Sequence, residues 1–186
     1  MRASAVLLVS FAFVAATSAP QKPAAPKKPQ IDVLFAQLAK AGSPEEAKPL
    51  EDQIFALFEA SGSPSIDLLM ARGTAAMAGG DDDAAKRLFN SVTDIAPEYA
   101  EGWHQRAQTQ LQDGDDEAAM LSLQKTVTLN PRQFEAMSQL GDLLEEYGNK
   151  PGALKMYRRA LALDPQLEGA AKHVTALERD VEGQGI

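Results

Sequence analysis

The chain has 186 residues, of which 45% are hydrophobic and 24% charged, a composition typical of one soluble globular domain with a hydrophobic core. It contains no cysteine, which excludes disulfides, thiolate metal sites, a catalytic cysteine and a lipid-modified cysteine, and its two histidines are too few to indicate a zinc site. From residue 31 onward 14 basic residues stand against 26 acidic ones, and this net charge of −12 argues against nucleic acid or an anionic lipid surface as partners.

The first 19 residues have the pattern of a secretory signal peptide. Arg2 supplies the basic start, residues 5–16 form an apolar run, and residues 15–19 are small, as a cleavage zone requires. The apolar run is shorter than the roughly 20 residues that span a bilayer, so we expect a cleaved signal rather than an uncleaved membrane anchor. The sequence thus predicts an exported protein that is not a lipoprotein, most simply a periplasmic one.

Residues 20–30 follow the signal and contain four prolines and three lysines. Such a composition predicts an extended, flexible linker without a helix. The linker begins with Pro20, which disfavours cleavage directly before it, so cuts after Ala16 and after Ser18 compete with one after Ala19.

Residues 31–65 are predicted to form two helices. The first covers residues 31–40, and the second ends near Ala60. Two starts compete for the second helix, because Ser43 and Pro44 form one start signal and Pro49 forms another. We expect either a kink or a helix that begins at Leu50, and we interpret the pair as a degenerate repeat with a shortened first helix.

From residue 66 onward, three kinds of residue recur at intervals of 34. They are a proline, a glycine and an alanine in each interval: Pro97, Pro131 and Pro165; Gly80, Gly114 and Gly148; Ala85, Ala119 and Ala153. A period of 34 residues is typical of stacked helix-turn-helix repeats. We therefore assign three repeats to residues 66–99, 100–133 and 134–167.

Each repeat has the chemistry of two closely packed helices, a first helix A at positions 1–13 and a second helix B at positions 17–30. Positions 8 and 20 hold small residues, and position 24 holds a large one that fills the space between them. The proline at position 32 ends helix B. Position 8 holds Gly73, Ala107 and Gly141, and position 24 holds Phe89, Leu123 and Tyr157. Position 30 holds Ile95, Leu129 and Leu163, which we expect to anchor the end of helix B.

The segment 168–186 is predicted to close the array. A helix over residues 167–180 would cover the apolar face of the last repeat, as the ends of solenoids require, and the tail from Glu182 is expected to fray.

This pattern resembles the tetratricopeptide repeat (TPR). The second repeat carries Trp103, Gly114, Ala119 and Pro131 in the family's register, and the third carries Leu140, Gly141, Gly148, Ala153, Tyr157, Ala160 and Pro165. The resemblance covers residues 66–167 and implies an all-α, right-handed α-solenoid with a capping helix. The layout of residues 31–186 is also similar to small exported bacterial proteins of this family.

The resemblance further implies a concave groove lined by positions 2, 5, 9, 12 and 13 of each helix A. The candidate partner-binding residues are Met70, Thr74, Met77, Glu101, His104, Gln108, Leu111, Ser138, Asp142 and Glu145. The lining changes from apolar and methionine-rich to acidic, which favours a protein or peptide segment that is apolar at one end and basic at the other. The alternative is that the acidic stripe is only a solvated face.

Individual side chains in these helices allow more than one interpretation. Trp103 is expected in the core and His104 is expected to be exposed, either as a ligand contact or without a role. Arg72 and Arg106, where the family usually has leucine, could bind a carboxylate, but we expect each to pair with an acidic residue of the protein itself.

No catalytic, metal-binding or cofactor-binding motif is present in the sequence. We therefore expect a non-catalytic adaptor or scaffold of the bacterial cell envelope that needs no cofactor. Two alternatives are a self-associating structural element and an accessory regulator of an envelope enzyme.

Overall fold

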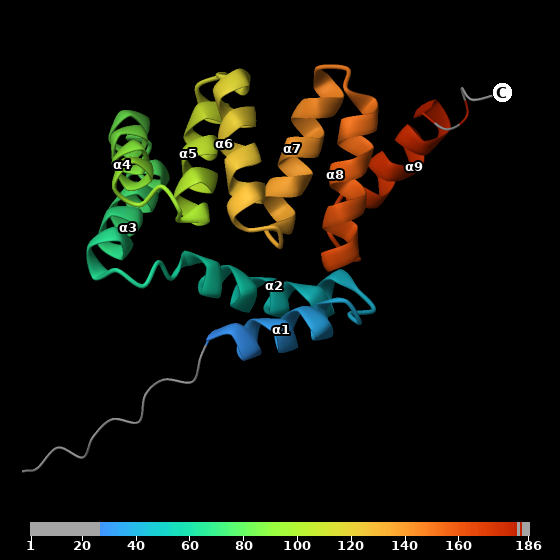
Figure 1. The fold of residues 1–186 in the computed structure, drawn as a ribbon, viewed down its shortest axis with the longest axis horizontal. Coiled ribbons are helices and arrows are strands. Elements are labelled where there is room, and N and C mark those ends of the chain that lie inside the picture. The colour runs from blue at the N-terminus through green and yellow to red at the C-terminus, as the bar shows by residue number, and fades with distance from the viewer. Residues whose placement is uncertain (1–26, 182, 184–186) are drawn as a thin grey trace, which may run out of the picture.

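The computed structural model describes residues 27–181 and 183, so the predicted signal peptide, most of the linker and most of the tail lie outside it. The described residues form nine α-helices and no strand (Figure 1). They comprise an N-terminal hairpin, three stacked helix pairs and one last helix.

The hairpin consists of α1 (Lys27–Leu38) and α2 (Pro44–Glu59). Because α1 begins at Lys27, the expected helix-free linker is wrong for residues 27–30. The start of α2 is Pro44, where the Ser43 hydroxyl accepts a hydrogen bond from the Glu46 N–H at 3.4 Å. The helix continues through Pro49, which removes one intrahelical hydrogen bond without ending the helix.

The three pairs follow the 34-residue period. Their first helices are α3 (Pro64–Ala78), α5 (Ala100–Gln112) and α7 (Phe134–Glu146), and their second helices are α4 (Asp82–Ile95), α6 (Asp116–Leu129) and α8 (Lys150–Leu163). The turn glycines Gly80, Gly114 and Gly148 have φ of +76°, +72° and +78°, a conformation that favours glycine. One residue later, the side chains of Asp81, Asp115 and Asn149 accept hydrogen bonds from the first turns of α4, α6 and α8.

Close approach of the two helices in a pair depends on the small residue at position 8. A Cβ atom added at Gly73 would lie 2.6 Å from Phe89, and one added at Gly141 would lie 2.8 Å from Tyr157. The expected anchoring role of Ile95 is wrong, because its side chain is 66% exposed. Leu163 at the same position packs against the core that includes the N-terminal hairpin, and Ile95 lacks that cover.

The hairpin does not stack on α3 as a further repeat would. Instead, α2 crosses the ends of the pairs, where each helix B turns into the next helix A (Figure 1). Its C-terminal end meets the first turn, where the Tyr99 hydroxyl donates to the Glu59 carbonyl at 2.6 Å. Farther along, Phe55 packs on Phe134 with ring centroids 5.1 Å apart. We call residues 27–59 the strap.

The strap continues to the third turn and is also held from α1. Gln166 donates its side-chain N–H to the Ala41 carbonyl, between α1 and α2, at 3.0 Å. Arg132 pairs with Asp32 and lies 3.8 Å from the ring centroid of Phe35. The strap therefore runs antiparallel to the order of the repeats and contacts all three turns.

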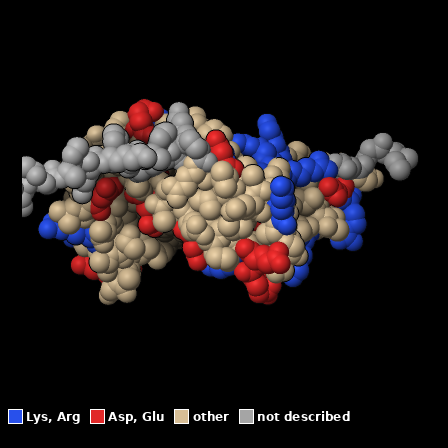
Figure 2. Space-filling model, turned by 90° about the horizontal axis from the view of Figure 1, so that it is seen from below, with Lys and Arg blue, Asp and Glu red and all other residues tan. Residues whose placement is uncertain are grey.

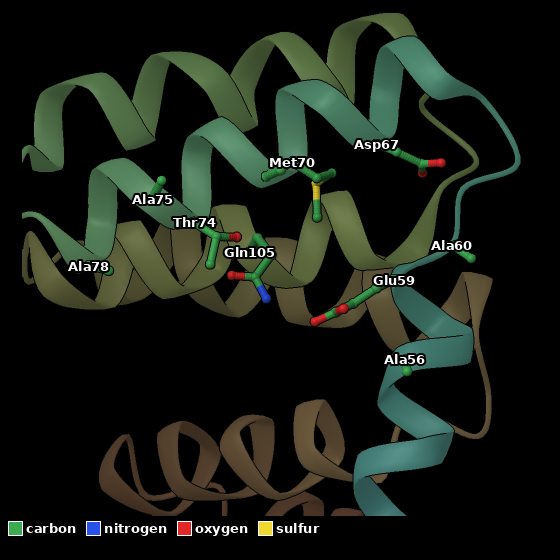
Figure 3. Close-up of a pocket in the computed structure, with 10 residues that line it drawn as sticks. Ala56, Glu59, Ala60, Asp67, Met70, Thr74, Ala75, Ala78 and Gln105 are labelled. Carbon is green, nitrogen blue, oxygen red and sulfur yellow. The ribbon is translucent and has the colours of Figure 1, made fainter.

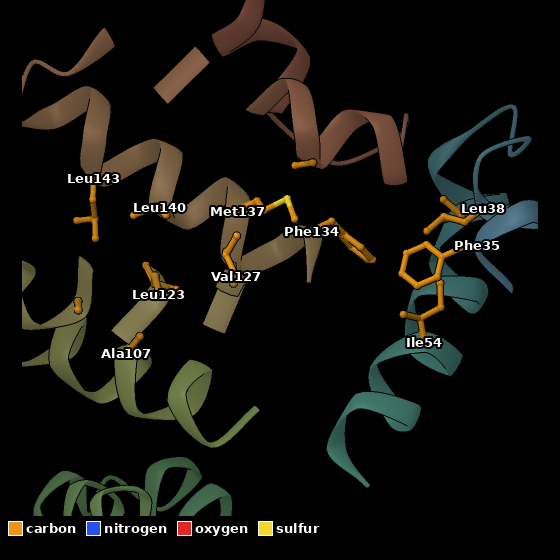
Figure 4. Close-up of a cluster of buried hydrophobic side chains, with 14 of the residues drawn as sticks. Phe35, Leu38, Ile54, Ala107, Leu123, Val127, Phe134, Met137, Leu140 and Leu143 are labelled. Carbon is orange, nitrogen blue, oxygen red and sulfur yellow. The ribbon is translucent and has the colours of Figure 1, made fainter. Parts of the chain in front are cut away.

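The largest hydrophobic core joins the strap to the second and third repeats (Figure 4). It contains Phe35, Leu38 and Ile54 from the strap together with Phe134 and Met137 from α7. The first repeat has a separate core: Ile66, Met70, Ala85, Phe89 and Val92. The two ends of the stack are thus covered unequally.

The last helix, α9 (Ala170–Val181), begins three residues after the predicted start at residue 167, directly after Gly169, whose φ is +78°. Leu177 is buried against α8, and Lys150 pairs with Asp180 at 2.6 Å. Among the described helices, none combines the length and hydrophobicity needed to cross a membrane.

Candidate partner-binding site

Within the described residues, the predicted groove is hollowed into a cleft at the first repeat. This cleft of about 620 Å³ lies between the C-terminal end of α2, α3 and the middle of α5 (Figure 3). Its lining residues are Ala56, Glu59, Ala60, Asp67, Met70, Ala71, Thr74, Ala75, Ala78 and Gln105. Two of the predicted groove residues, Met70 and Thr74, line this cleft, whereas the half-buried Met77 packs on the core of the first repeat.

The cleft combines an apolar wall with two carboxylates. The alanines of α3 and the largely buried Met70 form the wall, and Figure 3 shows the Glu59 side chain directed into the space between α2 and α3. Asp67 accepts hydrogen bonds from the hydroxyl and N–H of Ser61, at 2.6 and 3.0 Å. Such a site suits an apolar side chain next to a cation.

The strap residues of this cleft were not predicted. Ala56, Glu59 and Ala60 reach it because α2 crosses the turns instead of stacking, and no local pattern in the sequence reveals that path. Gln105 was also missed, since it stands at position 6, outside the concave positions that the family resemblance implies.

In the second repeat, the expectation of an exposed His104 is wrong. The side chain is 3% exposed, and Glu101 beside it is 6% exposed. The His104 Nδ1 atom lies 3.2 Å from a Glu101 carboxylate oxygen and 3.1 Å from the Gln133 amide nitrogen. On the other side of the ring, Nε2 lies 3.1 Å from the Gln139 amide oxygen. These hydrogen bonds join α5 to α7, and the buried side chains of His104 and Glu101 are therefore not available to a partner.

This arrangement satisfies His104 in both protonation states. The neutral ring accepts from Gln133 and donates to Gln139, and the protonated ring donates to Glu101 instead of accepting. Burial alone would lower the pKa of His104, but the hydrogen bond and charge of Glu101 raise it above its ordinary value. Burial would likewise raise the pKa of Glu101, and the hydrogen bonds from His104, Gln105 and Gln133 together lower it.

Gln108 of α5, also a predicted groove residue, donates its side-chain N–H to the Gln139 amide oxygen at 2.8 Å. Leu111 and Ser138 are half-buried, and Leu111 packs against the largest core. The second repeat therefore presents little free concave surface.

In the third repeat, the acidic residues of the predicted groove have partners within the protein. The Tyr157 hydroxyl donates to Asp142 at 2.6 Å and to Glu145 at 3.2 Å. Glu145 also lies 2.8 Å from Nδ1 of His173, whose ring stacks on Tyr157 with centroids 4.8 Å apart. Because His173 belongs to α9, the capping helix contacts Glu145 at the end of the groove that was expected to be acidic, while Asp142 remains exposed.

The two arginines at position 7 behave differently from each other. Arg106 donates to the Thr93 hydroxyl at 3.3 Å and lies 5.2 Å from the ring centroid of Trp103, so it is held within the protein but not by a carboxylate. Trp103 is half-buried and donates its ring N–H to the Pro97 carbonyl at 2.9 Å. Arg72 is exposed.

Within the described residues, no group of three histidine, aspartate or glutamate side chains is arranged to hold a metal ion. The lining of the cleft offers apolar contact, two carboxylates, one hydroxyl and one amide.

Comparison with known proteins identifies the class to which this fold belongs. Residues 100–133, the second repeat, match the family model of the tetratricopeptide repeat. A TPR repeat-containing protein of Rhizobium etli is 32% identical over 80 residues, which are 43% of this chain and 39% of that protein. The match with this curated relative thus spans less than half of its length.

Solved structures support the same class. The TPR domain of Arabidopsis OM64 matches with a TM-score of 0.58 and 20% identity over 63% of this chain and 97% of that one. The Yersinia enterocolitica type III secretion chaperone SycD, in complex with a peptide of the translocator YopD, matches with a TM-score of 0.57 and 11% identity, over 63% of this chain and 95% of SycD. The first TPR of Spaghetti (RPAP3), bound to an HSP90 peptide, matches with a TM-score of 0.58 and 20% identity, over 63% and 93% of the two chains. At these identities the likeness concerns the fold.

The resemblance found in the sequence is therefore confirmed for residues 100–133, and the described helices have the all-α solenoid fold of tetratricopeptide repeat domains. This fold is generally a non-catalytic module for protein–protein interaction.

Proposed function

We propose that the protein is a non-catalytic adaptor that binds a segment of a partner protein in the cleft between α2, α3 and α5. The observation that supports the proposal most directly is the cleft itself, about 620 Å³ with an alanine wall, at the first repeat. The solved neighbours SycD and Spaghetti, each in complex with a peptide, are consistent with this use of the fold.

The chemistry of the cleft favours a partner segment with an apolar residue next to lysine or arginine. The apolar residue would contact Met70 and the alanines of α3, and the cation would approach Glu59 and Asp67 at the end of the cleft. An acidic C-terminal segment is disfavoured, because positions 2, 5, 6 and 9 of the A helices carry no lysine or asparagine to hold its carboxylates.

We further propose that the protein acts in the cell envelope after export. The apolar run and small residues within the first 19 positions support this location, and the acidic body agrees with a partner that carries positive charge.

A peptide-display selection on the purified protein tests the cleft directly. Peptides selected by the wild type are measured for affinity against Thr74→Arg, in which an exposed residue of the cleft becomes a long cation. We expect affinity to fall at least about tenfold, because the arginine fills the cleft and repels a basic segment. The matched control is Thr128→Arg on the exposed face of α6, which should leave affinity unchanged.

The direction of the charge effect is a second readout in the same assay. Glu59→Gln should weaken basic peptides and reduce the salt dependence of their binding. Equal affinity of the wild type and both Thr74→Arg and Glu59→Gln would contradict the proposed cleft.

A further inference from the structure

A buried carboxylate in the third turn lacks a hydrogen-bond donor. Asp164 follows the last residue of α8, and its side chain is 0% exposed. Its Oδ1 atom accepts the N–H of Gln166 at 3.0 Å, whereas no N–H or hydroxyl group of the described residues donates to the buried Oδ2 atom. An ionised carboxylate oxygen that is buried without a donor is strongly disfavoured. Asp164 therefore requires a proton at this place, on itself or on a neighbour.

The turn itself does not need an acid at this position. The equivalent residue of the second repeat is Asn130, whose side-chain oxygen accepts the N–H of Arg132 at 3.1 Å in the same way. Asn130 is half-buried, and so is Ala96 at the same position of the first repeat. The carboxyl group and its complete burial are thus particular to the third turn.

The carboxyl group of Glu51 in the strap faces Asp164. Three residues of α2 at intervals of four, which place them on one face of the helix, meet the three turns in order. Glu59 contacts the first turn, Phe55 the second, and Glu51 the third through a hydrogen bond between its carboxyl group and Asp164. Two carboxyl groups can form a hydrogen bond only when one of them is protonated. A proton on this pair therefore supplies the donor that Asp164 lacks.

The surroundings of the pair compensate its charge only weakly. In the part of the chain that the structure describes, the charged groups that act on it are Lys48 and Asp52 of α2. The Lys48 Nζ atom lies 3.7 Å from Glu51 but 2.9 Å from Asp52, and the lysine side chain is 64% exposed. Glu135 of α7 also acts on Lys48. Because this cation is shared and solvated, it offsets the repulsion between two ionised carboxylates only in part.

The pKa values of both carboxyl groups agree with this geometry. Burial raises the pKa of Asp164 above its ordinary value, against the hydrogen bonds with Gln166 and Glu51. Burial also raises the pKa of Glu51, and the negative charge of Asp164 and the hydrogen bond to it raise that pKa further. The folded protein thus holds the proton more tightly than the unfolded chain. The stability that the pair contributes is present near the ordinary carboxyl pKa and is lost as pH rises through the folded values.

We infer that Glu51 and Asp164 share one proton and form a pH-sensitive latch between the strap and the third turn. The latch is closed while the proton lies between the two carboxyl groups. When pH rises, the proton passes to water, and the repulsion between the two carboxylates loosens α2 from the turn. The strap also supplies Ala56, Glu59 and Ala60 to the cleft, so the latch tunes the cleft as well. Only this last consequence rests on the proposed function.

Carbon-13 NMR of the side-chain carboxyl groups in the purified protein detects the shared proton. We expect Glu51 or Asp164 to titrate at least about one pH unit above the ordinary carboxyl range. Asp164→Asn places an amide N–H where the donor is missing, and Asn130 shows that the turn accepts this side chain. Glu51 should then titrate lower than in the wild type, because the neighbouring charge is gone. Titration of both groups of the wild type within the ordinary range would overturn the inference.

Hydrogen exchange of the α2 amides tests whether the proton holds the strap. At about pH 8.5, protection around Glu51 should be at least about tenfold lower in the wild type than in Asp164→Asn or Glu51→Gln, since each variant replaces a charge by a donor. At about pH 5 the three proteins should agree within about threefold, because the wild type then carries its own proton. The matched control is Glu168→Gln, an exposed carboxylate beyond the same turn, which should exchange like the wild type at both pH values.

Equal protection of the wild type and both variants at the higher pH would also overturn the inference. Exchange is measured without a peptide, so an error in the proposed cleft leaves this result unchanged. Loss of peptide binding in Thr74→Arg reports on the cleft alone, because Thr74 lies in α3 and does not contact the latch.

Discussion

Gly73 and Gly141 show how single residues set the geometry of the repeats. Each is small because an aromatic ring of the partner helix, Phe89 or Tyr157, lies where its side chain would be. This was predictable, since the small residue and the large one recur in the same register in the sequence. The position of His104 was not predictable, because its burial depends on Gln133 and Gln139, which the fold brings from 29 and 35 residues away.

The buried pair of His104 and Glu101 predicts a pH dependence of stability. Because the folded pKa of His104 is raised, its stabilising contribution is present below the ordinary histidine pKa and is lost as pH rises through the folded value. Because the folded pKa of Glu101 is lowered, its contribution is present above the ordinary glutamate pKa and is lost as pH falls through the folded value.

We therefore expect His104→Gln to destabilise the protein by about 2 kcal/mol near pH 6, and by clearly less near pH 9. Urea unfolding of the wild type and the variant across this range measures the difference. His173→Gln, at a half-buried histidine of α9, is the control for general histidine effects. If the difference in unfolding free energy between the wild type and His104→Gln stays constant with pH, the expected charge interaction between His104 and Glu101 is contradicted.

At the scale of elements, the strap decides which part of the concave surface remains free. Local signals in the sequence identified both of its helices, but the contacts that fix its path join distant residues. The bond from Tyr99 to Glu59 spans 40 residues, and the bond from Gln166 to Ala41 spans 125. The interpretation as a degenerate repeat failed because helix periodicity shows which face of a helix is apolar, but not which surface that face will cover.

The packing of Phe55 on Phe134 is expected to hold the strap. Phe55→Ala should destabilise the protein by about 2 kcal/mol, less than a fully buried phenylalanine, and should increase cleavage by a protease in the connection near Gly62. Val33→Ala, at a 56% exposed residue of α1, is the control and should change stability by less than about 0.5 kcal/mol. Urea unfolding and limited proteolysis make the comparison. Equal effects of both substitutions would mean that the aromatic contact does not anchor the strap.

At the scale of the whole molecule, the separate core of the first repeat predicts unequal local stability. The pair α3 and α4 has one neighbour in the stack, which is α5. In contrast, α5 to α8 share the largest core with the strap. In a solenoid, stability is approximately the sum of each repeat and its interfaces with neighbours. A repeat with fewer interfaces should open more readily.

Hydrogen exchange of the monomer should therefore be faster for the amides of α3 and α4 than for those of α5 to α8. The amides of α9 serve as the internal reference for a helix with one packed side. Uniform exchange across all repeats would show that the protein opens as a single unit.

The sequence by itself determined the class of fold, the three repeats and the positions of the small and large residues inside each helix pair. All of these depend on contacts between residues near in the chain, which recur with a 34-residue period that can be read directly. Only the tertiary structure decided which surface is free. The strap, the buried pair of His104 and Glu101, and the contact of α9 with Glu145 arise from segments that are distant in the chain, and the period carries no information about such contacts. Of the residues expected to bind a partner, Met70 and Thr74 line the cleft, and the structure adds strap residues that the sequence did not predict.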